Sequence, residues 1–185
     1  MIPGNLAKRY ARALLELASS PLQRDRFEKD LNALAATSEV LDETGTPLAL
    51  TLDAGRYPLS QRRALGGAIC KRLMVDPTVT KFLDLVVERG RASGLPQIAL
   101  QYTDLADAQA GRVRATVSSA TPLAPGATAQ VKMALEGATG KTVLLEQNVD
   151  PELIGGLVTQ VGSYRLDRSV KTMLEQMRSG LKQGA

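Results

Sequence analysis

Apolar residues recur at helical spacing from the N-terminus to about residue 110. Prolines, glycines and serines interrupt this 3.6-residue period, and the pattern predicts helices near residues 3–18, 22–42, 47–53, 59–73, 77–90 and 96–110. Pro77 directly after Asp76 is typical of a capped helix start, and Gly111 is typical of a helix end. The first part of the chain is therefore expected to be helical.

After Gly111 the spacing of apolar residues changes to two. Val113, Ala115 and Val117 alternate with polar residues, which predicts a half-buried strand. The fold class is therefore expected to be α+β and mostly α, with a helical domain over residues 1–110 and a small mixed β-α-β-β-α domain over residues 111–185. The later elements are expected to be a helix at 125–138, strands at 142–149 and 157–166, and a helix at 169–182 whose apolar face holds Val170, Met173, Leu174, Met177 and Leu181.

The first predicted helix is apolar on almost two faces. At 100° per residue its charged side chains occupy a single arc, so its apolar residues cover most of the remaining surface. A surface helix needs only one apolar stripe, which is much narrower. This helix therefore either lies at the centre of its own bundle or forms one wall of a groove for a partner helix. One apolar edge holds Leu6, Tyr10, Ala13, Leu14 and Leu17, and the other holds Ala7, Ala11, Leu15 and Ala18.

The segment near residues 77–90 favours the groove. Leu85 lies between Lys81 and Arg89 in a mainly charged sector, with Phe82 at its border. An apolar residue there predicts an exposed contact, and two such helices would accept an amphipathic helix through positions i, i+3, i+4 and i+7. The core stripe of the same segment is expected to consist of Val79, Leu83, Val86 and Val87.

The composition excludes several kinds of chemistry. The 185 residues include no histidine, no tryptophan and one cysteine, which excludes a histidine base and the commonest zinc sites. Cys70 lies among apolar residues and is expected to be a buried thiol in a reducing, cytoplasmic setting. The carboxylates, including Asp42, Glu43 and Glu152, show no spacing for paired acid–base work. No metal, cofactor or active site is expected.

The net charge of +4 does not form a basic arm. Residues 1–105 hold 14 Lys/Arg against 12 Asp/Glu, and residues 106–185 hold 9 against 7. Four tyrosines and two phenylalanines are too few for a base-stacking platform, so no nucleic acid is expected, although a nucleic-acid-associated helical adaptor remains an alternative and an enzyme a more distant one. The N-terminus does not have the pattern of a signal or transit peptide, and prolines interrupt the longest uncharged stretch, so direct membrane insertion is not expected.

Several glycine and aspartate motifs are best explained as turns. Gly140-Lys141-Thr142 imitates the end of a phosphate-binding loop, but Leu135 stands where that loop requires glycine, so the segment is expected to be a helix-to-strand turn. The other expected turns, close backbone approaches and helix caps are at Gly90, Asp150-Pro151, Gly155-Gly156 and Asp167-Arg168-Ser169.

Four segments, in fixed order along the chain, carry a family resemblance. The chain resembles the delta subunit of bacterial F-type ATP synthases, the counterpart of the mitochondrial oligomycin-sensitivity-conferring subunit, over essentially its full length. The matching segments are Ala7-Lys8-Arg9-Tyr10-Ala11-Arg12-Ala13-Leu14, Glu88-Arg89-Gly90-Arg91, Val149-Asp150-Pro151-Glu152-Leu153-Ile154-Gly155-Gly156 and Asp167-Arg168-Ser169-Val170.

The resemblance implies a non-catalytic connector in the peripheral stalk. It implies a six-helix bundle that caps the α/β catalytic head, a C-terminal domain that joins the b subunits, and one copy per complex at the cytoplasmic face of the bacterial inner membrane. In such proteins the N-terminal helix of an α subunit docks on the first and fifth helices. This places the partner-binding site at Leu6, Tyr10, Ala13 and Leu17, opposite Lys81, Phe82 and Leu85.

Overall fold

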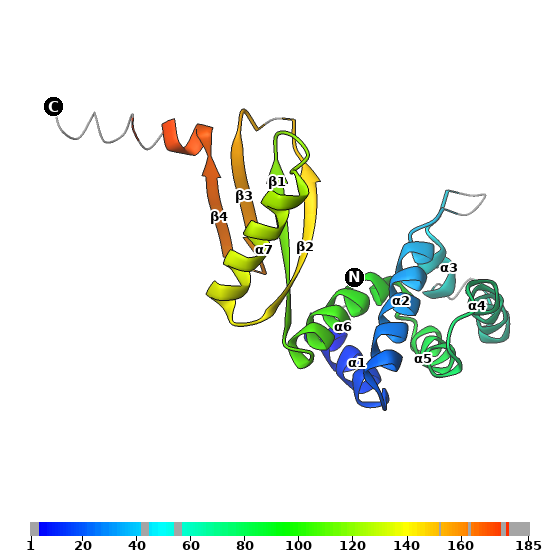
Figure 1. Cartoon of the computed structure of the whole chain (residues 1–185). Helices are drawn as coiled ribbons and strands as arrows, with labels where there is room; N and C mark the ends of the chain where they lie inside the picture. The colour runs from blue at the N-terminus through cyan, green and yellow to red at the C-terminus, as the bar shows by residue number, and fades with distance from the viewer. Residues whose placement is uncertain are drawn as a thin grey trace. The chain divides into compact units, whose positions relative to one another are not determined.

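The chain divides into two compact units. A computed structural model describes residues 4–41, 45–53, 57–151, 153–162, 164–174 and 177 (Figure 1). The units are Met1–Ala106 and Asp107–Ala185, so the division falls inside the last helix of the first half, a few residues before the position expected from the sequence.

Helices form the first unit, and each helical segment expected from the sequence has a counterpart. A short 3₁₀ helix, η1, was not predicted; it comes directly before α6. The expected helix ends at residues 3 and 42 lie outside the described residues. The helices are α1 (Gly4–Glu16), α2 (Pro21–Ser38), α3 (Leu48–Asp53), α4 (Leu59–Leu73), α5 (Pro77–Glu88), η1 (Ala92–Gly94) and α6 (Leu95–Gln109).

Local hydrogen bonds explain where α2 begins and ends. The amide of Gln23 donates to Ser20 Oγ at 3.2 Å, and the Gln23 side chain accepts from the amide of Ser19 at 2.9 Å. At the other end the hydroxyls of Thr37 and Ser38 donate to carbonyls of the preceding turn at 2.8 and 2.7 Å. Such hydroxyl bonds compete with the helical ladder, and α2 ends at Ser38, earlier than predicted.

Aliphatic side chains fill the core of the helical unit. The stripe Val79, Leu83, Val86 and Val87 predicted for α5 is buried. Tyr102 is fully buried as well, and its hydroxyl donates to the Arg24 carbonyl at 3.3 Å. With so few aromatics, the core depends on leucine, valine and alanine; its largest fully buried side chains include Leu14, Phe27, Leu31, Leu83, Leu95, Ile98 and Tyr102.

Burial of Tyr102 is expected to make this protein sensitive to alkali. Burial and, secondarily, the Glu28 carboxylate raise the pKa of Tyr102 to about 12, from 10.0. Between these values the unfolded chain releases the phenolic proton while the folded chain retains it, so the free energy of unfolding falls as pH rises. The loss should approach roughly 2 to 3 kcal/mol by pH 12.

Urea denaturation at pH 8 and pH 11.5 measures this effect. Tyr102→Phe has no phenol to ionise, so its stability should fall less between the two pH values than that of the unsubstituted protein. Equal losses in the two proteins would show that Tyr102 does not contribute.

A four-stranded mixed sheet and one helix form the body of the second unit. The strand order is β2-β1-β3-β4; β1 pairs in parallel with β2 and antiparallel with β3, which pairs antiparallel with β4. The parallel pair is joined by α7, which lies across one face of the sheet (Figure 1). The elements are β1 (Arg112–Ser119), α7 (Pro125–Thr139), β2 (Thr142–Val149), β3 (Gly156–Val161) and β4 (Tyr164–Ser169).

The prediction of a single strand over residues 157–166 was wrong. A turn divides this run into β3 and β4, and Gly162 in that turn has a φ of 56°. Glycine adopts this left-handed conformation without the steric cost that other residues have, so the chain reverses here. Val170–Leu174 and Met177 are helical, as expected for the last element, and its remainder to residue 182, with Leu181, lies outside the described residues.

The expected turn residues lie at chain reversals. Gly140 ends α7 with a φ of 64°, directly before β2, so the Gly-Lys-Thr segment is a helix-to-strand turn. The amide of Leu153 donates to the Asp150 carbonyl at 3.2 Å, which closes a turn through Pro151. Gly155 and Gly156 stand at the start of β3. No helix in the described part of the chain is long and apolar enough to cross a membrane.

The helical segment that follows β4 is capped at its start, as the sequence predicted. Asp167 Oδ1 accepts from the Ser169 amide at 2.9 Å, and Ser169 Oγ accepts from the Thr172 amide at 3.2 Å. The hydrogen bond from the Ser169 amide is the main reason why the pKa of the Asp167 carboxyl is lowered. These bonds fix the point where β4 passes into the terminal helix.

Candidate partner-binding groove

Helix α1 presents its two apolar edges to different surroundings. Ala7 and Ala11 on one edge are fully buried in the core of the helical unit, and so is Leu14, which the sequence placed on the opposite edge. On the other edge Leu6 and Tyr10 are half-buried, Ala13 is exposed, and the Leu17 side chain is 59% exposed. Because that second edge is not covered, α1 is not the central helix of a closed bundle.

Helix α5 forms the facing wall. Its core stripe is buried, whereas Leu85 is 43% exposed, in agreement with its position in a charged sector. Phe82, placed at the border of that sector by the sequence, is buried, with 8% of its surface exposed. Helix α5 therefore offers one exposed leucine beside a ring that belongs partly to the core.

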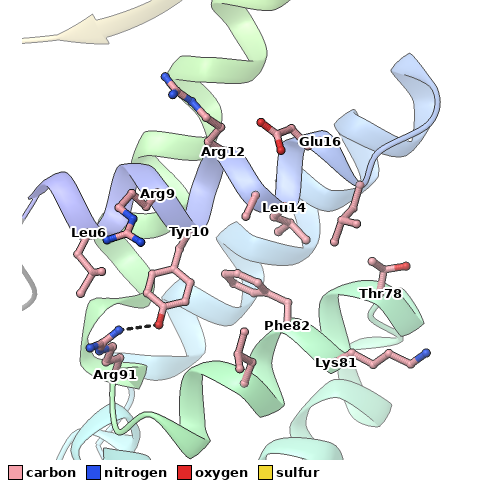
Figure 2. Close-up of a pocket in the computed structure, with 13 residues that line it drawn as sticks. Leu6, Arg9, Tyr10, Arg12, Leu14, Glu16, Thr78, Lys81, Phe82 and Arg91 are labelled. Atoms are coloured by element: carbon pink, nitrogen blue, oxygen red, sulfur yellow. Dashed lines mark hydrogen bonds between the residues drawn. The ribbon is translucent and has the colours of Figure 1, made fainter.

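A groove of about 920 Å³ lies between α1 and α5 (Figure 2). It contains all seven residues that the sequence named for partner binding, so the structure brings that whole set together. It also contains side chains that the sequence had not named. The lining residues are Leu6, Arg9, Tyr10, Arg12, Ala13, Leu14, Glu16, Leu17, Thr78, Lys81, Phe82, Leu85 and Arg91.

Three side chains fix the middle of the groove. The rings of Tyr10 and Phe82 meet edge to face, with centroids 6.0 Å apart and an interplanar angle of 78°. Arg91 Nη1 donates to the Tyr10 hydroxyl at 2.7 Å, and the Arg91 Cζ lies 5.8 Å from the Tyr10 ring centroid (Figure 2). Since Tyr10 has a ring contact and a hydrogen bond, its orientation is set before any partner arrives.

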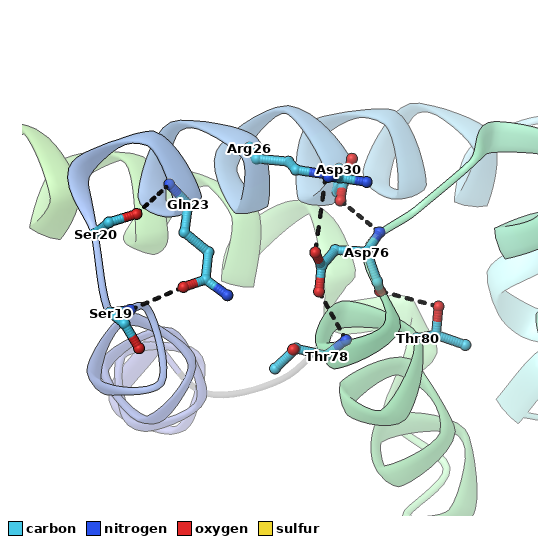
Figure 3. Close-up of polar contacts among 8 residues, drawn as sticks. All are labelled: Ser19, Ser20, Gln23, Arg26, Asp30, Asp76, Thr78 and Thr80. Atoms are coloured by element: carbon cyan, nitrogen blue, oxygen red, sulfur yellow. Dashed lines mark hydrogen bonds and ion pairs between the residues drawn. The ribbon is translucent and has the colours of Figure 1, made fainter.

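The start of α5 is attached to α2 by a polar network around Asp76 (Figure 3). The Asp76 amide donates to Asp30 Oδ2 at 2.8 Å, and Asp76 Oδ1 accepts from the Thr78 amide at 2.9 Å. Arg26 Nε lies 3.8 Å from Asp76 Oδ2. One aspartate thus caps α5, as predicted, and also joins α5 to a neighbouring helix, which holds the α5 wall in position.

The chain after α5 is held by Asp53 at the end of α3. Gly90, with a φ of 62°, turns the chain, and Arg91 follows. Asp53 then accepts from the amides of Ala92 and Ser93, the latter at 2.8 Å. These bonds place the backbone that carries Arg91 next to Tyr10.

Loss of the Asp53 carboxylate is expected to destabilise the helical unit. Asp53→Ala leaves two amides of η1 without their charged acceptor, which should lower the free energy of unfolding by roughly 2 kcal/mol. Urea denaturation monitored by circular dichroism measures the change. Asp104→Ala removes an exposed carboxylate from α6 and serves as the matched control. Equal stability of the two variants would contradict the role given to Asp53.

Possible metal ligands, the single cysteine and the carboxylates are the groups that bear on chemistry. Among the described residues, no three His, Cys, Asp or Glu side chains are grouped so that they could hold a metal ion. Cys70 is buried as expected, and burial raises the pKa of its thiol, which disfavours the reactive thiolate. Asp42, Glu43 and Glu152 lie outside the described residues.

The charged rim of the groove was mostly missed by sequence reasoning. Arg9, Arg12 and Glu16 belong to the charged arc predicted for the first helix, and they also border the groove. Arg91 was noted only within a family motif. Its place beside Tyr10 depends on a contact between residues far apart in the sequence, which helical periodicity does not report.

Comparisons with known proteins point to one family. The family model described as ATP synthase delta (OSCP) subunit matches residues 6–181. The ATP synthase subunit delta of Myxococcus xanthus is 40% identical over 187 residues, covering 99% of this chain and 100% of that protein. The corresponding subunit of Geobacter metallireducens is 36% identical over 184 residues, with both chains covered completely.

A solved structure shares the fold. A chain in the cryo-EM structure of the Toxoplasma gondii mitochondrial ATP synthase hexamer aligns with a TM-score of 0.66 at 20% sequence identity. The alignment covers 95% of this chain and 97% of that one. At this low identity the likeness supports the mixed fold, with its helices and its sheet.

Proposed function

Because this chain belongs to the ATP synthase delta (OSCP) subunit family, we propose that it is the non-catalytic connector of the peripheral stalk in an F-type ATP synthase. In this role it links the α/β catalytic head to the membrane-anchored b subunits and resists rotor torque during ATP synthesis. One copy acts in each complex. It is held at the cytoplasmic face of the bacterial inner membrane by its partners and does not itself insert.

The helical unit binds the N-terminal helix of an α subunit in the groove between α1 and α5. The observation that carries this proposal is the pair of facing apolar walls, with Leu17 on α1 and Leu85 on α5 both exposed. From Leu6 to Leu17 the α1 wall is about 16 Å long at ~1.5 Å per residue, which matches roughly three turns of a docked helix. A helix of that length presents apolar residues at i, i+3, i+4 and i+7.

The preformed middle of the groove supports tight binding. Each buried apolar anchor contributes roughly 1.5 to 3 kcal/mol, and association costs several kcal/mol, so three or four anchors from each side are enough for nanomolar affinity. Tyr10 is already held by Phe82 and Arg91, which reduces the ordering cost at the centre. A connector needs such affinity because it has to hold its partner through every turnover.

The second unit joins the b subunits through exposed apolar side chains near the C-terminus. Met173 and Leu174 are exposed on the helical segment that follows β4. Ile154, which is 76% exposed, lies just before Gly155, whose carbonyl accepts from the Val170 amide at the start of that segment. Large apolar side chains gathered near one end of a small unit are typical of a protein-binding surface. Their number supports a contact that is separate from the groove.

Isothermal titration with the full-length protein tests the groove proposal. The probe is a synthetic peptide of the first two dozen or so residues of the ATP synthase α subunit from the same organism. One-to-one binding that persists at high salt is expected. No binding by the folded protein would reject the proposed docking, and affinity for nucleic acid that falls steeply with salt would favour the alternative of a nucleic-acid adaptor.

A further inference from the structure

The two ends of the groove carry different charges. Arg9 and Arg91 lie at the Leu6 end, while Glu16 on α1 and Lys81 on α5 lie toward the opposite end (Figure 2). Among the lining residues, the Leu6 end therefore has two guanidinium groups and no carboxylate, whereas the other end has one charge of each sign. Arg12 and Glu16 both extend from the outer side of α1, away from Phe82 and Lys81 (Figure 2).

The Arg91 guanidinium is held in place at its end of the groove. Its Nη1 donates to the neutral hydroxyl of Tyr10 at 2.7 Å, a bond that does not cancel its positive charge. Its backbone amide donates to the Val86 carbonyl at 3.0 Å, and Asp53 accepts from the next two amides. Because a guanidinium has five N–H donors, Arg91 retains donors for a partner after it has bonded to Tyr10.

A docked helix has unlike ends as well. Its last four carbonyls lack intrahelical partners and carry a partial negative charge, and its first four amides carry a partial positive charge. Arginine donors satisfy such carbonyls directly, and each favourable charge placement at a helix end stabilises the complex modestly. The reverse placement would bring the positive helix end against two guanidinium groups.

We propose, on the basis of the docking function above, that the partner helix lies with its C-terminal end at the Leu6 end of the groove, where Arg9 and Arg91 bind its terminal carbonyls. Its N-terminal end then lies toward Glu16. The docked helix therefore runs antiparallel to α1, and a carboxylate placed just after its last turn strengthens the complex.

Paramagnetic labelling of the peptide tests this orientation. The full-length protein carries isotope-labelled leucine methyl groups, assigned through Leu6→Ile and Leu17→Ile, and the α-subunit peptide carries a nitroxide at either end of its helix. The C-terminal label is expected to broaden the Leu6 signals, and the N-terminal label those of Leu17. The opposite pattern would overturn the orientation while leaving the docking function intact; absence of saturable binding would instead remove the docking function itself.

A charge comparison provides the second test. Arg9→Gln is expected to weaken peptide binding about two- to fivefold at low salt. Lys8→Gln removes a positive charge from the exposed neighbouring position, which does not line the groove, and should leave affinity unchanged. A peptide that ends in a free carboxylate after its last turn should bind the unsubstituted protein more tightly than its amide form, and Arg9→Gln should reduce that preference. Equal affinities of the two variants, or an unaltered preference in Arg9→Gln, would contradict the proposal.

Discussion

Replacement of Leu85 with aspartate is expected to weaken binding of the α-subunit peptide by at least about 100-fold. The substitution removes an apolar anchor, which contributes roughly 1.5 to 3 kcal/mol when buried, and adds a carboxylate that the docked helix would have to desolvate. Leu85 is already 43% exposed in the free protein, so aspartate at this position should leave the helical unit folded. Titration calorimetry measures the loss of affinity.

Leu100→Asp is the matched control for this prediction. Leu100 lies on α6, is 61% exposed and does not line the groove. Both variants should keep the circular dichroism spectrum and the unfolding temperature of the unsubstituted protein to within a few degrees. Peptide affinity that is unchanged in Leu85→Asp, or lost equally in Leu100→Asp, would show that the groove is not where the helix binds.

Gly156→Ala is expected to disrupt the sheet of the second unit. Gly156 has a φ of 86°, and a Cβ atom there would lie 2.3 Å from the Arg168 carbonyl oxygen and 2.9 Å from the Ser169 Cα. Both contacts are with the backbone of β4, so no side-chain rotation relieves them. Together with the strained φ, the collision should cost roughly 4 kcal/mol or more, enough to separate β4 from β3 or to unfold the unit.

Gly162→Ala separates the collision from the backbone strain. Gly162 also has a positive φ, 56°, but a Cβ at that position would meet no atom of the described residues within 4 Å, its chain neighbours aside. This control should lose only about 1 kcal/mol, the cost of the left-handed conformation alone. Amide hydrogen exchange of β3 and β4, measured in both variants, should show faster exchange in Gly156→Ala. Equal protection in the two variants would mean that the backbone can move away from the added methyl group.

Local patterns were enough to predict most elements of this fold. Helical periodicity predicted α5 with its buried stripe, and the same pattern identified Leu85 as an exposed apolar residue. Alternation predicted β1, whose Ala115 and Val117 are buried. These predictions succeed because each depends on the spacing of residues within one element, which the sequence states directly.

Features that depend on contacts between distant segments could not be predicted in the same way. Periodicity tells which face of a strand is buried but not which strand lies beside it, so the order β2-β1-β3-β4 had to come from the structure. Similarly, the Arg91 bond to Tyr10 joins residues 81 positions apart. The turn at Gly162 is a different kind of miss, because Gly162-Ser163 between two apolar runs is a local hairpin signal that the sequence does contain.

The strand order also determines how the second unit responds to pulling. Two antiparallel pairings in succession make β1 and β4 point in the same direction. Tension applied through the chain before β1 and after β4 therefore pulls these strands in opposite directions along their length. The hydrogen bonds of both ladders are loaded in shear and must break together, whereas a hairpin pulled open at its end loses them one at a time. Under such tension the sheet should resist extension until its ladders fail together.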